Sequence, residues 1–425
     1  MRTSGRWTAP AGRRPDPVTA GYGDGTMTAP APWERAARGA MLLDDHGRLA
    51  TTIFAEMSAL AARTGAVNLG QGFPDEDGPA EVLAAAHAAI DAGLNQYPPG
   101  RGTPGLLDAV AEHQRRFYGI ELDPAREVLV TAGATEALAA TLLALVDDGD
   151  EVVTLEPFYD AYGALVGLAG GTHVTVRLHG PDFRVDHGEL RAAFSDRTRV
   201  VVVNDPHNPT GTVLDDATRR LVVELARRHD AVIVTDEVYE HLLFDGARHV
   251  PISTLPGAAE RTITVSSGGK TFATTGWKVG WLSGPEELVS RVLTVKQYLT
   301  YVNASVFQPA IAVGLRLPDE YFSQLAAGLQ AKRDLLSAGL EAAGFAVSPS
   351  HGSYFVVADA APLGHHDAAE LCRRLPELAG VVGVPLSAFC RDGGAPGTSS
   401  LVRFAFCKKT EVLERAVEQL ARLRA

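Results

Sequence analysis

The residue whose position most directly suggests chemistry is a lysine set among glycines. Lys270 follows the sequence SSGG at residues 266–269, directly after an apolar, β-branched run. A Walker-type phosphate loop is excluded, because its first glycine would fall at Thr264. The other chemistry that uses a lysine on a tight glycine turn is imine formation with a carbonyl, aided by burial that lowers the amine pKa. A lysine in an ordinary loop is the alternative.

Two more groups of polar residues follow predicted strands. Asp236 and Tyr239 come after one strand, and Asn208 stands in the proline-bounded turn NDPHNPTG at residues 204–211. Parallel sheets bind ligands at the carboxyl ends of their strands. A carboxylate there could keep a pyridine nitrogen protonated, and a tyrosine could bond a ring oxygen. The alternatives are a helix-capping aspartate, a half-buried tyrosine and a purely structural turn.

Two features suggest binding of anions. The sequence TAGATE at residues 131–136 leads from a strand into an apolar helix, whose first free amides can bind an anion. Arg403 lies inside the apolar run Leu401–Phe406, where a guanidinium can hold a carboxylate through two hydrogen bonds. An ordinary capped helix and an internal ion pair are the respective alternatives.

The hydrophobic pattern predicts the elements that position these residues. From about residue 82 to 315, short β-branched runs alternate with helical patterns, which is typical of a parallel α/β sheet covered on both faces. After residue 320 the pattern predicts a long amphipathic helix, short strands and a terminal helix from Thr410, hence a second, smaller α+β domain. The predicted strands are Val128–Thr131, Glu151–Leu155, His173–Arg177, Arg199–Asn204, Ala231–Thr235, Thr262–Ser266, Ser353–Val357 and Leu401–Phe406.

Composition narrows the class of protein. The 425 residues include 39 basic and 51 acidic ones, and a net charge of −12 disfavours partners such as nucleic acid or anionic membranes. Three cysteines are too few for a disulfide framework, and no metal site is predicted. The longest apolar run, Ala137–Val146, is too short to span a bilayer, and without an apolar leader the expected location is cytoplasmic. Residues 1–40 are expected to form a disordered tail.

Taken in order, the motifs resemble the class I/II pyridoxal-phosphate aminotransferases, within them the kynurenine/glutamine transaminase branch. The resemblance covers about residues 42–425, and it implies an α/β, aspartate aminotransferase-like fold. In this fold a large domain with a mostly parallel mixed sheet binds the cofactor, pyridoxal 5′-phosphate. The predicted parts are the tail 1–40, an N-terminal segment 41–81 packing with the small domain, the large domain 82–318 and the small domain 319–425. The matching segments are 68–75, 95–97, 204–211, 236–241, 266–281 and 402–409.

The resemblance also implies a role for each matching residue. Lys270 would hold the cofactor covalently and then move the proton as a base. Asp236 would pair with the pyridine nitrogen, while Tyr239 and Asn208 would bond the ring 3-oxygen. The other implied contacts are Ala134, Thr135, Ser267 and Lys278 with the phosphate, Tyr159 with the ring face, Arg403, Gly72 and Asn208 with the substrate, and Tyr97 with the phosphate of a neighbouring subunit in a homodimer.

Several segments, among them NQYPPG and KQYLTYV, resemble bacterial enzymes assigned as N-succinyldiaminopimelate aminotransferases. The expected donor is therefore N-succinyl-LL-2,6-diaminopimelate, with 2-oxoglutarate as acceptor, in lysine biosynthesis. A broad kynurenine, glutamine and methionine transaminase or a cysteine-conjugate β-lyase are the alternatives, since they share the same residues. A regulator of this fold is discarded, because the 40-residue tail is too short for a DNA-binding domain. Phe54 stands where some relatives have a pocket Trp. Arg101 and Lys296 are candidates for a second cation that binds the substrate. The alternative for each is a side chain that faces solvent.

Overall fold

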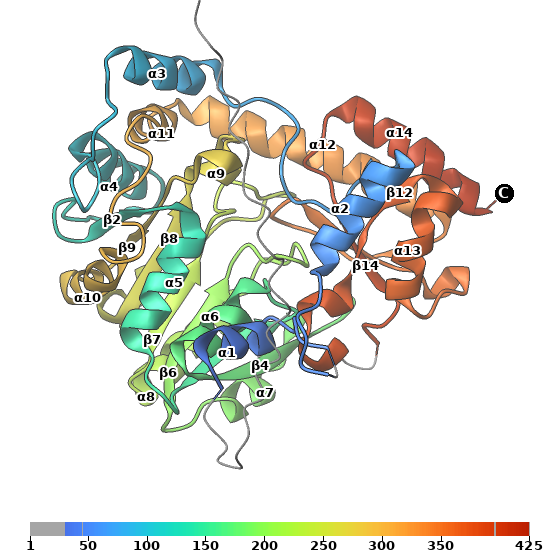
Figure 1. Ribbon diagram of the computed structural model, residues 1–425, viewed down its shortest axis with the longest axis horizontal. Helices are drawn as coiled ribbons and strands as arrows, with labels where there is room; N and C mark the ends of the chain where they lie inside the picture. Colours follow the sequence, from blue (N-terminus) through green and yellow to red (C-terminus); the bar gives the residue numbers. More distant parts are fainter. Residues whose placement is uncertain (1–29, 45, 395–396, 425) are drawn as a thin grey trace, which may run out of the picture. The chain divides into compact units, whose positions relative to one another are not determined.

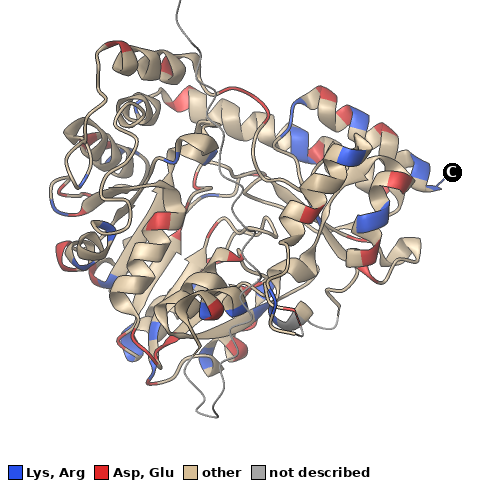
Figure 2. Cartoon of the chain, in the orientation of Figure 1, with Lys and Arg blue, Asp and Glu red and all other residues tan. Residues whose placement is uncertain are grey.

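The computed structural model describes residues 30–44, 46–394 and 397–424, and from Pro32 onward the chain forms one compact unit (Figure 1). Because this unit is continuous, the division at residues 41, 82 and 319 stays a prediction. Figure 2 shows acidic and basic residues interspersed along its helices. No helix in the described part of the chain is long and apolar enough to cross a membrane.

A mixed sheet of eight strands carries the residues predicted to do chemistry. The neighbouring pairs among its central strands are parallel, and the pairs that involve β9 or β5 are antiparallel. The predicted parallel sheet is therefore confirmed as the mostly parallel, mixed sheet of an α/β fold. In spatial order its strands are β2 (Val128–Thr131), β9 (Gly280–Ser283), β8 (Thr262–Ser267), β7 (Val232–Asp236), β6 (Thr198–Asn204), β3 (Glu151–Glu156), β4 (Thr172–His179) and β5 (Arg184–Val185).

Helices cover both faces of this sheet, which explains why its strands are continuous apolar runs. Successive residues of β6 point to opposite faces, so Val200 and Val202 lie in one core and Val201 and Val203 in another. The first core contains α5 (Gly133–Leu145), α6 (Ala161–Ala169) and α10 (Glu286–Lys296), and the second contains α7 (His187–Ala192) and α8 (Asp216–Arg228). At the β2 edge a third core joins α3 (Ala80–Asp91), α4 (Pro104–Tyr118) and α11 (Gln308–Leu315).

A smaller antiparallel sheet lies in the C-terminal third of the chain. Its order is β10 (Ala346–Val347), β11 (Phe355–Asp359), β14 (Leu401–Ala405) and β13 (Val384–Pro385). It packs with α12 (Asp319–Ala343), α13 (Ala368–Ala379) and α14 (Thr410–Leu420). The N-terminal α2 (Ile53–Thr64) contacts α13, and β1 (Val67–Asn68) pairs with β12 (Val381–Val382). The remaining helices are α9 (Gly268–Thr271) and the short 3₁₀ turns Ile252–Thr254, Ala259–Arg261, Thr275–Trp277, Ala361–Leu363, Leu386–Phe389, Arg391–Gly393 and Ala421–Arg424.

The structure corrects the predicted extent of the N-terminal tail. Residues 1–29 lie outside the described residues, but Pro32–Gly39 form helix α1, which packs on α6. A Cβ atom placed on Gly163 would lie 2.2 Å from the Gly39 carbonyl oxygen, and one on Gly167 would lie 2.3 Å from that of Arg35. Helix α1 is therefore held by a close approach to glycines more than 120 residues away. Its own short, polar sequence gives no sign of this contact.

Candidate active site

The predicted site residues converge on one cavity of about 370 Å³. It lies at the carboxyl ends of β6 and β7, where parallel sheets place their ligands. Every residue assigned to the cofactor or substrate within one subunit lines it. These residues are Gly72, Ala134, Thr135, Tyr159, Asn208, Asp236, Tyr239, Ser267, Lys270, Lys278 and Arg403.

Lys270 reaches this cavity from the short helix α9, directly after β8. The two preceding glycines are closely packed, since a Cβ on Gly268 would lie 2.7 Å from a methyl carbon of Ile311 and one on Gly269 would lie 3.0 Å from Cα of Thr275. Burial lowers the pKa of the Lys270 amine from its usual range. A lowered pKa makes the neutral, nucleophilic amine more available. The structure thus favours the chemical interpretation over a loop lysine.

Asp236 ends β7 and is buried at the floor of the cavity. Its carboxylate accepts a hydrogen bond from the Tyr162 hydroxyl at 2.7 Å and a longer one, 3.5 Å, from the Val238 amide. Burial raises the pKa of this carboxyl, because little water remains to solvate its charge. A cationic N–H in the cavity would stabilise the carboxylate form. No helix begins at Asp236, so the capping alternative is not observed.

A candidate anion site lies at the wall of the cavity where α5 follows β2 and α9 follows β8. Helix α5 begins at Gly133, which has a φ of 75°, and its first amides include those of Ala134 and Thr135. The Lys278 side chain lies over this turn, since a Cβ on Gly133 would be 3.1 Å from Lys278 Nζ. Ser267 immediately precedes α9 on the same side of the cavity. Free amides, a hydroxyl and an ammonium together suit a phosphate group.

Arg403 enters the cavity from β14 and is 3% exposed. Its guanidinium donates to Oδ1 of Asn208 at 3.1 Å and to the Gly70 carbonyl at 2.7 Å. Among the described residues, no carboxylate forms an ion pair with it, and its buried Nε has no partner. Burial therefore lowers its pKa to about 10. An internal ion pair, the alternative for this arginine, is not found in the described chain.

Aromatic rings fix the Arg403 side chain in place. The guanidinium carbon lies 4.1 Å from the ring centre of Phe355 and 4.5 Å from that of Phe389. Phe54 packs edge-on against Phe389 at 5.4 Å. A Cβ on Gly72 would lie 2.5 Å from the Phe355 ring, so only glycine fits there. The cation is held in place at the cavity wall without a carboxylate partner among the described residues, which suits recognition of a carboxylate.

Three predicted residues lie outside the cavity of this subunit. Tyr97 is 80% exposed, and its ring lies 5.6 Å from that of Tyr301. Arg101 bonds the Arg126 carbonyl and is not in contact with the cavity. Lys296 does not face solvent as expected: it is 1% exposed, and its Nζ donates to the Tyr301 carbonyl at 2.6 Å. Neither cation supplies a second charge to the cavity of its own subunit.

Sequence reasoning missed several residues that shape the site. Tyr162 bonds Asp236, and Asn204 accepts from the Asn208 amide at 2.7 Å while donating to the Asp236 carbonyl at 2.7 Å. Asn204 could have been found, because it begins the proline-bounded turn. Tyr162, Phe355 and Phe389 carry no local signal, since they reach the cavity only through tertiary packing.

Comparison with known proteins agrees with this geometry. The family model described as "Aminotransferase class I and II" matches residues 64–420. "Probable N-succinyldiaminopimelate aminotransferase DapC" of Mycobacterium tuberculosis (strain ATCC 25618 / H37Rv) is 51% identical over 88% of this chain and 96% of its own length. The methionine aminotransferase of Escherichia coli (strain K12) is 40% identical over 88% and 97%, and the human kynurenine–oxoglutarate transaminase 3 is 36% identical over 87% and 87%.

Solved structures give the same result. The structure of N-succinyldiaminopimelate aminotransferase from Mycobacterium tuberculosis matches with a TM-score of 0.85 and 52% identity, covering 88% of this chain and 97% of that one. The resemblance found in the sequence motifs is thereby confirmed, as is the fold class. The chain therefore belongs to the class I and II aminotransferases, which transfer amino groups with pyridoxal 5′-phosphate as cofactor.

Proposed function

We propose that this enzyme moves the amino group of N-succinyl-LL-2,6-diaminopimelate to 2-oxoglutarate, in two ping-pong half-reactions of diaminopimelate and lysine biosynthesis. This choice of substrate rests on one observation: the chain is 51% identical, over 88% of its length, to the probable N-succinyldiaminopimelate aminotransferase of Mycobacterium tuberculosis. The methionine aminotransferase of Escherichia coli, whose name gives a different donor, is less similar at 40% identity. The reaction class itself follows from the family.

The cavity fits pyridoxal phosphate on three counts. The amides of Ala134 and Thr135 with Lys278 offer a phosphate site, and the buried Asp236 carboxylate suits a protonated pyridine nitrogen. The Lys270 amine, with its lowered pKa, suits a covalent link to the cofactor's carbonyl carbon. When bound, the cofactor withdraws electrons from the substrate Cα, so that the Cα proton can leave.

We assign the proton transfer to Lys270. With substrate bound, its Nζ would be a free amine in a buried site and could take the proton from Cα. The Tyr162 hydroxyl donates to Asp236 and so helps to stabilise the carboxylate form, which a protonated ring nitrogen would stabilise further. Tyr239 and Asn208 would bond the ring 3-oxygen, Tyr159 would pack on the ring face, and Ser267 would complete the phosphate site.

Arg403 binds the α-carboxylate of the substrate, assisted by the amide of Gly72. The guanidinium lines the cavity, is fixed between the rings of Phe355 and Phe389, and has no carboxylate partner among the described residues. The α-carboxylate would pair with this cation and so orient Cα toward Lys270. Amines that lack an α-carboxylate would bind without this orientation.

We further propose a homodimer in which Tyr97 reaches the phosphate bound by the partner subunit. The Tyr97 ring contacts that of Tyr301, which is 48% exposed, and Tyr298, three residues earlier in the chain, is 81% exposed. Exposed aromatic rings are typical of an interface. Replacing Tyr97 by phenylalanine should weaken cofactor retention on gel filtration while the mass from sedimentation stays that of a dimer. A monomeric wild-type enzyme would contradict this arrangement. A cytoplasmic location is also proposed, supported by three buried cysteines that form no disulfide.

The cavity also supports a second candidate, a broad transaminase of kynurenine, glutamine or methionine. Its described lining holds only three cations, Lys270, Lys278 and Arg403, and each already has an assigned role. The distal carboxylate of the succinylated donor would therefore need a cation from the partner subunit. Methionine and kynurenine need none, and relatives with those names match this chain.

A single-turnover experiment separates these candidates. The cofactor-loaded enzyme is mixed in turn with N-succinyl-LL-2,6-diaminopimelate, kynurenine, glutamine, methionine and aspartate, and the visible absorbance of the cofactor is followed. Fast loss of absorbance with the succinylated donor alone supports the proposal. Fast loss with kynurenine, glutamine or methionine rejects it in favour of the broad enzyme. Release of pyruvate and ammonia from cysteine conjugates would indicate a β-lyase.

A further inference from the structure

A second group of polar side chains is buried beside the cavity, on the same segment that supplies Asp236 and Tyr239. Within the motif DEVYEH, Asp236 and Tyr239 line the cavity, whereas Glu240 and His241 do not. Glu240 and His241 instead meet His113, which lies on α4. None of the three has a role in the proposed reaction.

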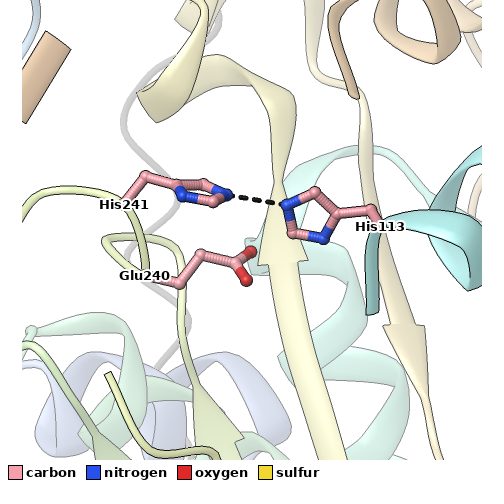
Figure 3. A group of neighbouring side chains, drawn as sticks. All are labelled: His113, Glu240 and His241. Carbon is pink, nitrogen blue, oxygen red and sulfur yellow. Dashed lines mark hydrogen bonds between the residues drawn. The ribbon is translucent and has the colours of Figure 1, made fainter. Parts of the chain in front are cut away.

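The three side chains converge on one point, as Figure 3 shows. Nε2 of His113 and Nε2 of His241 are 2.7 Å apart and share a hydrogen bond. The Glu240 carboxylate lies beside this bond, and one potential ligand atom from each residue lies within 4.8 Å of the others. Two imidazoles and a carboxylate are a ligand set that divalent transition metals prefer.

Polar atoms in this group lack partners. Glu240 is 4% exposed, and one of its oxygens accepts from the Ser266 hydroxyl at 2.7 Å. By distance and angle the other, Oε2, has no hydrogen-bond partner among the described residues, and neither does Nδ1 of the buried His113. The Tyr118 side chain is another polar group that interacts with this carboxylate. A buried carboxylate oxygen without a partner is costly, and a bound cation would remove that cost.

Neighbouring charged groups are already paired, which leaves the Glu240 carboxylate available to bind a cation. Arg116 pairs with Asp319, and His249 pairs with Glu237 at 2.8 Å, so these neighbouring charges are already matched. Phe322 packs against His241 with ring centres 4.3 Å apart, and Phe117 packs against His113 at 4.8 Å. These rings limit water around the imidazoles. His241 is itself partly exposed, which provides a path for an ion.

We propose that His113, Glu240 and His241 form a binding site for one divalent ion of the zinc class. At metal–nitrogen distances of about 2.1 Å and tetrahedral angles, the two Nε2 atoms would stand about 3.4 Å apart, so the rings need to separate by roughly 0.7 Å from their present 2.7 Å. The ring that now donates the hydrogen bond would move its proton from Nε2 to Nδ1. The ion would tie α4 to the segment after β7 and so support the position of Tyr239.

Metal content tests this site. The cofactor-loaded enzyme is treated with chelator, incubated with Zn²⁺ or Co²⁺, desalted and analysed by mass spectrometry of the metal. We expect about one ion per chain, and for Co²⁺ the visible bands of a four-coordinate site. His113→Gln should lose both the ion and the bands. His87→Gln, which removes an exposed imidazole on α3, should keep both.

Two results would overturn the proposal. One is a wild-type enzyme that retains no ion, and the other is a His113→Gln enzyme that retains as much as the wild type. Circular dichroism and cofactor absorbance establish that each variant is folded. Should His113→Gln fail to fold, Glu240→Gln takes its place, because glutamine keeps the shape and an acceptor for Ser266. Unchanged affinity in a folded Glu240→Gln enzyme would then reject the site.

Discussion

Replacement of Arg403 by alanine tests how the cavity recognises an amino acid. The substitution removes a guanidinium that is 3% exposed and leaves a substrate carboxylate facing the rings of Phe355 and Phe389. Truncating one partner of a desolvated charge pair costs about 2–5 kcal/mol. At 1.36 kcal/mol per tenfold, kcat/KM should fall by roughly 30- to 5,000-fold.

The assay compares the rate of the first half-reaction with an α-amino acid and with an amine of the same side chain that lacks the α-carboxylate. The amino acid should lose the full factor in the Arg403→Ala enzyme, and the amine should lose little. Arg403→Lys is the matched control, since it keeps the charge but not the two parallel hydrogen bonds, and should fall in between. An equal loss for amino acid and amine would refute a direct contact between Arg403 and the carboxylate.

Three further predictions concern the cofactor site and stability. Asp236→Asn should lower kcat by at least about 100-fold, because the pyridine nitrogen loses its anionic partner. Steady-state kinetics measure this loss, and circular dichroism verifies the fold. A near wild-type kcat would show that Asp236 is not part of the site. Gly163→Ala should destabilise the enzyme by about 1–3 kcal/mol in urea, since its Cβ would collide with Gly39, whereas Gly105→Ala meets nothing within 4 Å and should not. Burial lowers the pKa of His173 to about 4, so between pH 6.5 and 4 this histidine is protonated in the unfolded chain but neutral in the folded one. The free energy of unfolding should therefore fall by about 1.4 kcal/mol for each pH unit as the pH is lowered through this range. A His173→Gln enzyme should show a shallower loss of urea stability over that range, and an unchanged slope would reject this cause.

The central sheet was predictable because each of its long strands is an apolar run with its own boundaries. Val128–Thr131 forms β2 as expected, and the predicted helix after residue 320 is α12. Strand β9 was missed, since its four residues, GWLS, belong to a glycine-rich motif and pair antiparallel between two strands distant in sequence. Helix α1 was missed for the same reason: its stability depends on glycines of α6.

The site residues were predictable where one short segment contains both a reactive side chain and the end of a strand. Lys270 and Asp236 each follow a strand, and the structure brings both to one cavity. Partners supplied by distant segments were not predictable, as Tyr162 and Phe389 show. Lys296 shows the opposite failure, in which a predicted role is not found. Its charge predicted a side chain that faces solvent or binds substrate, but its ammonium donates to the carbonyls of Gly100 and Tyr301 inside the protein.

The assignment of Lys270 as the cofactor's covalent partner is the central claim, and chemical trapping tests it most directly. The cofactor-loaded enzyme is reduced with borohydride, digested and mapped by mass spectrometry. The account predicts a single modified peptide with the cofactor's mass on Lys270, and no modification in a Lys270→Ala enzyme of native fold. Modification of another lysine, or unaltered turnover by Lys270→Ala, would contradict it.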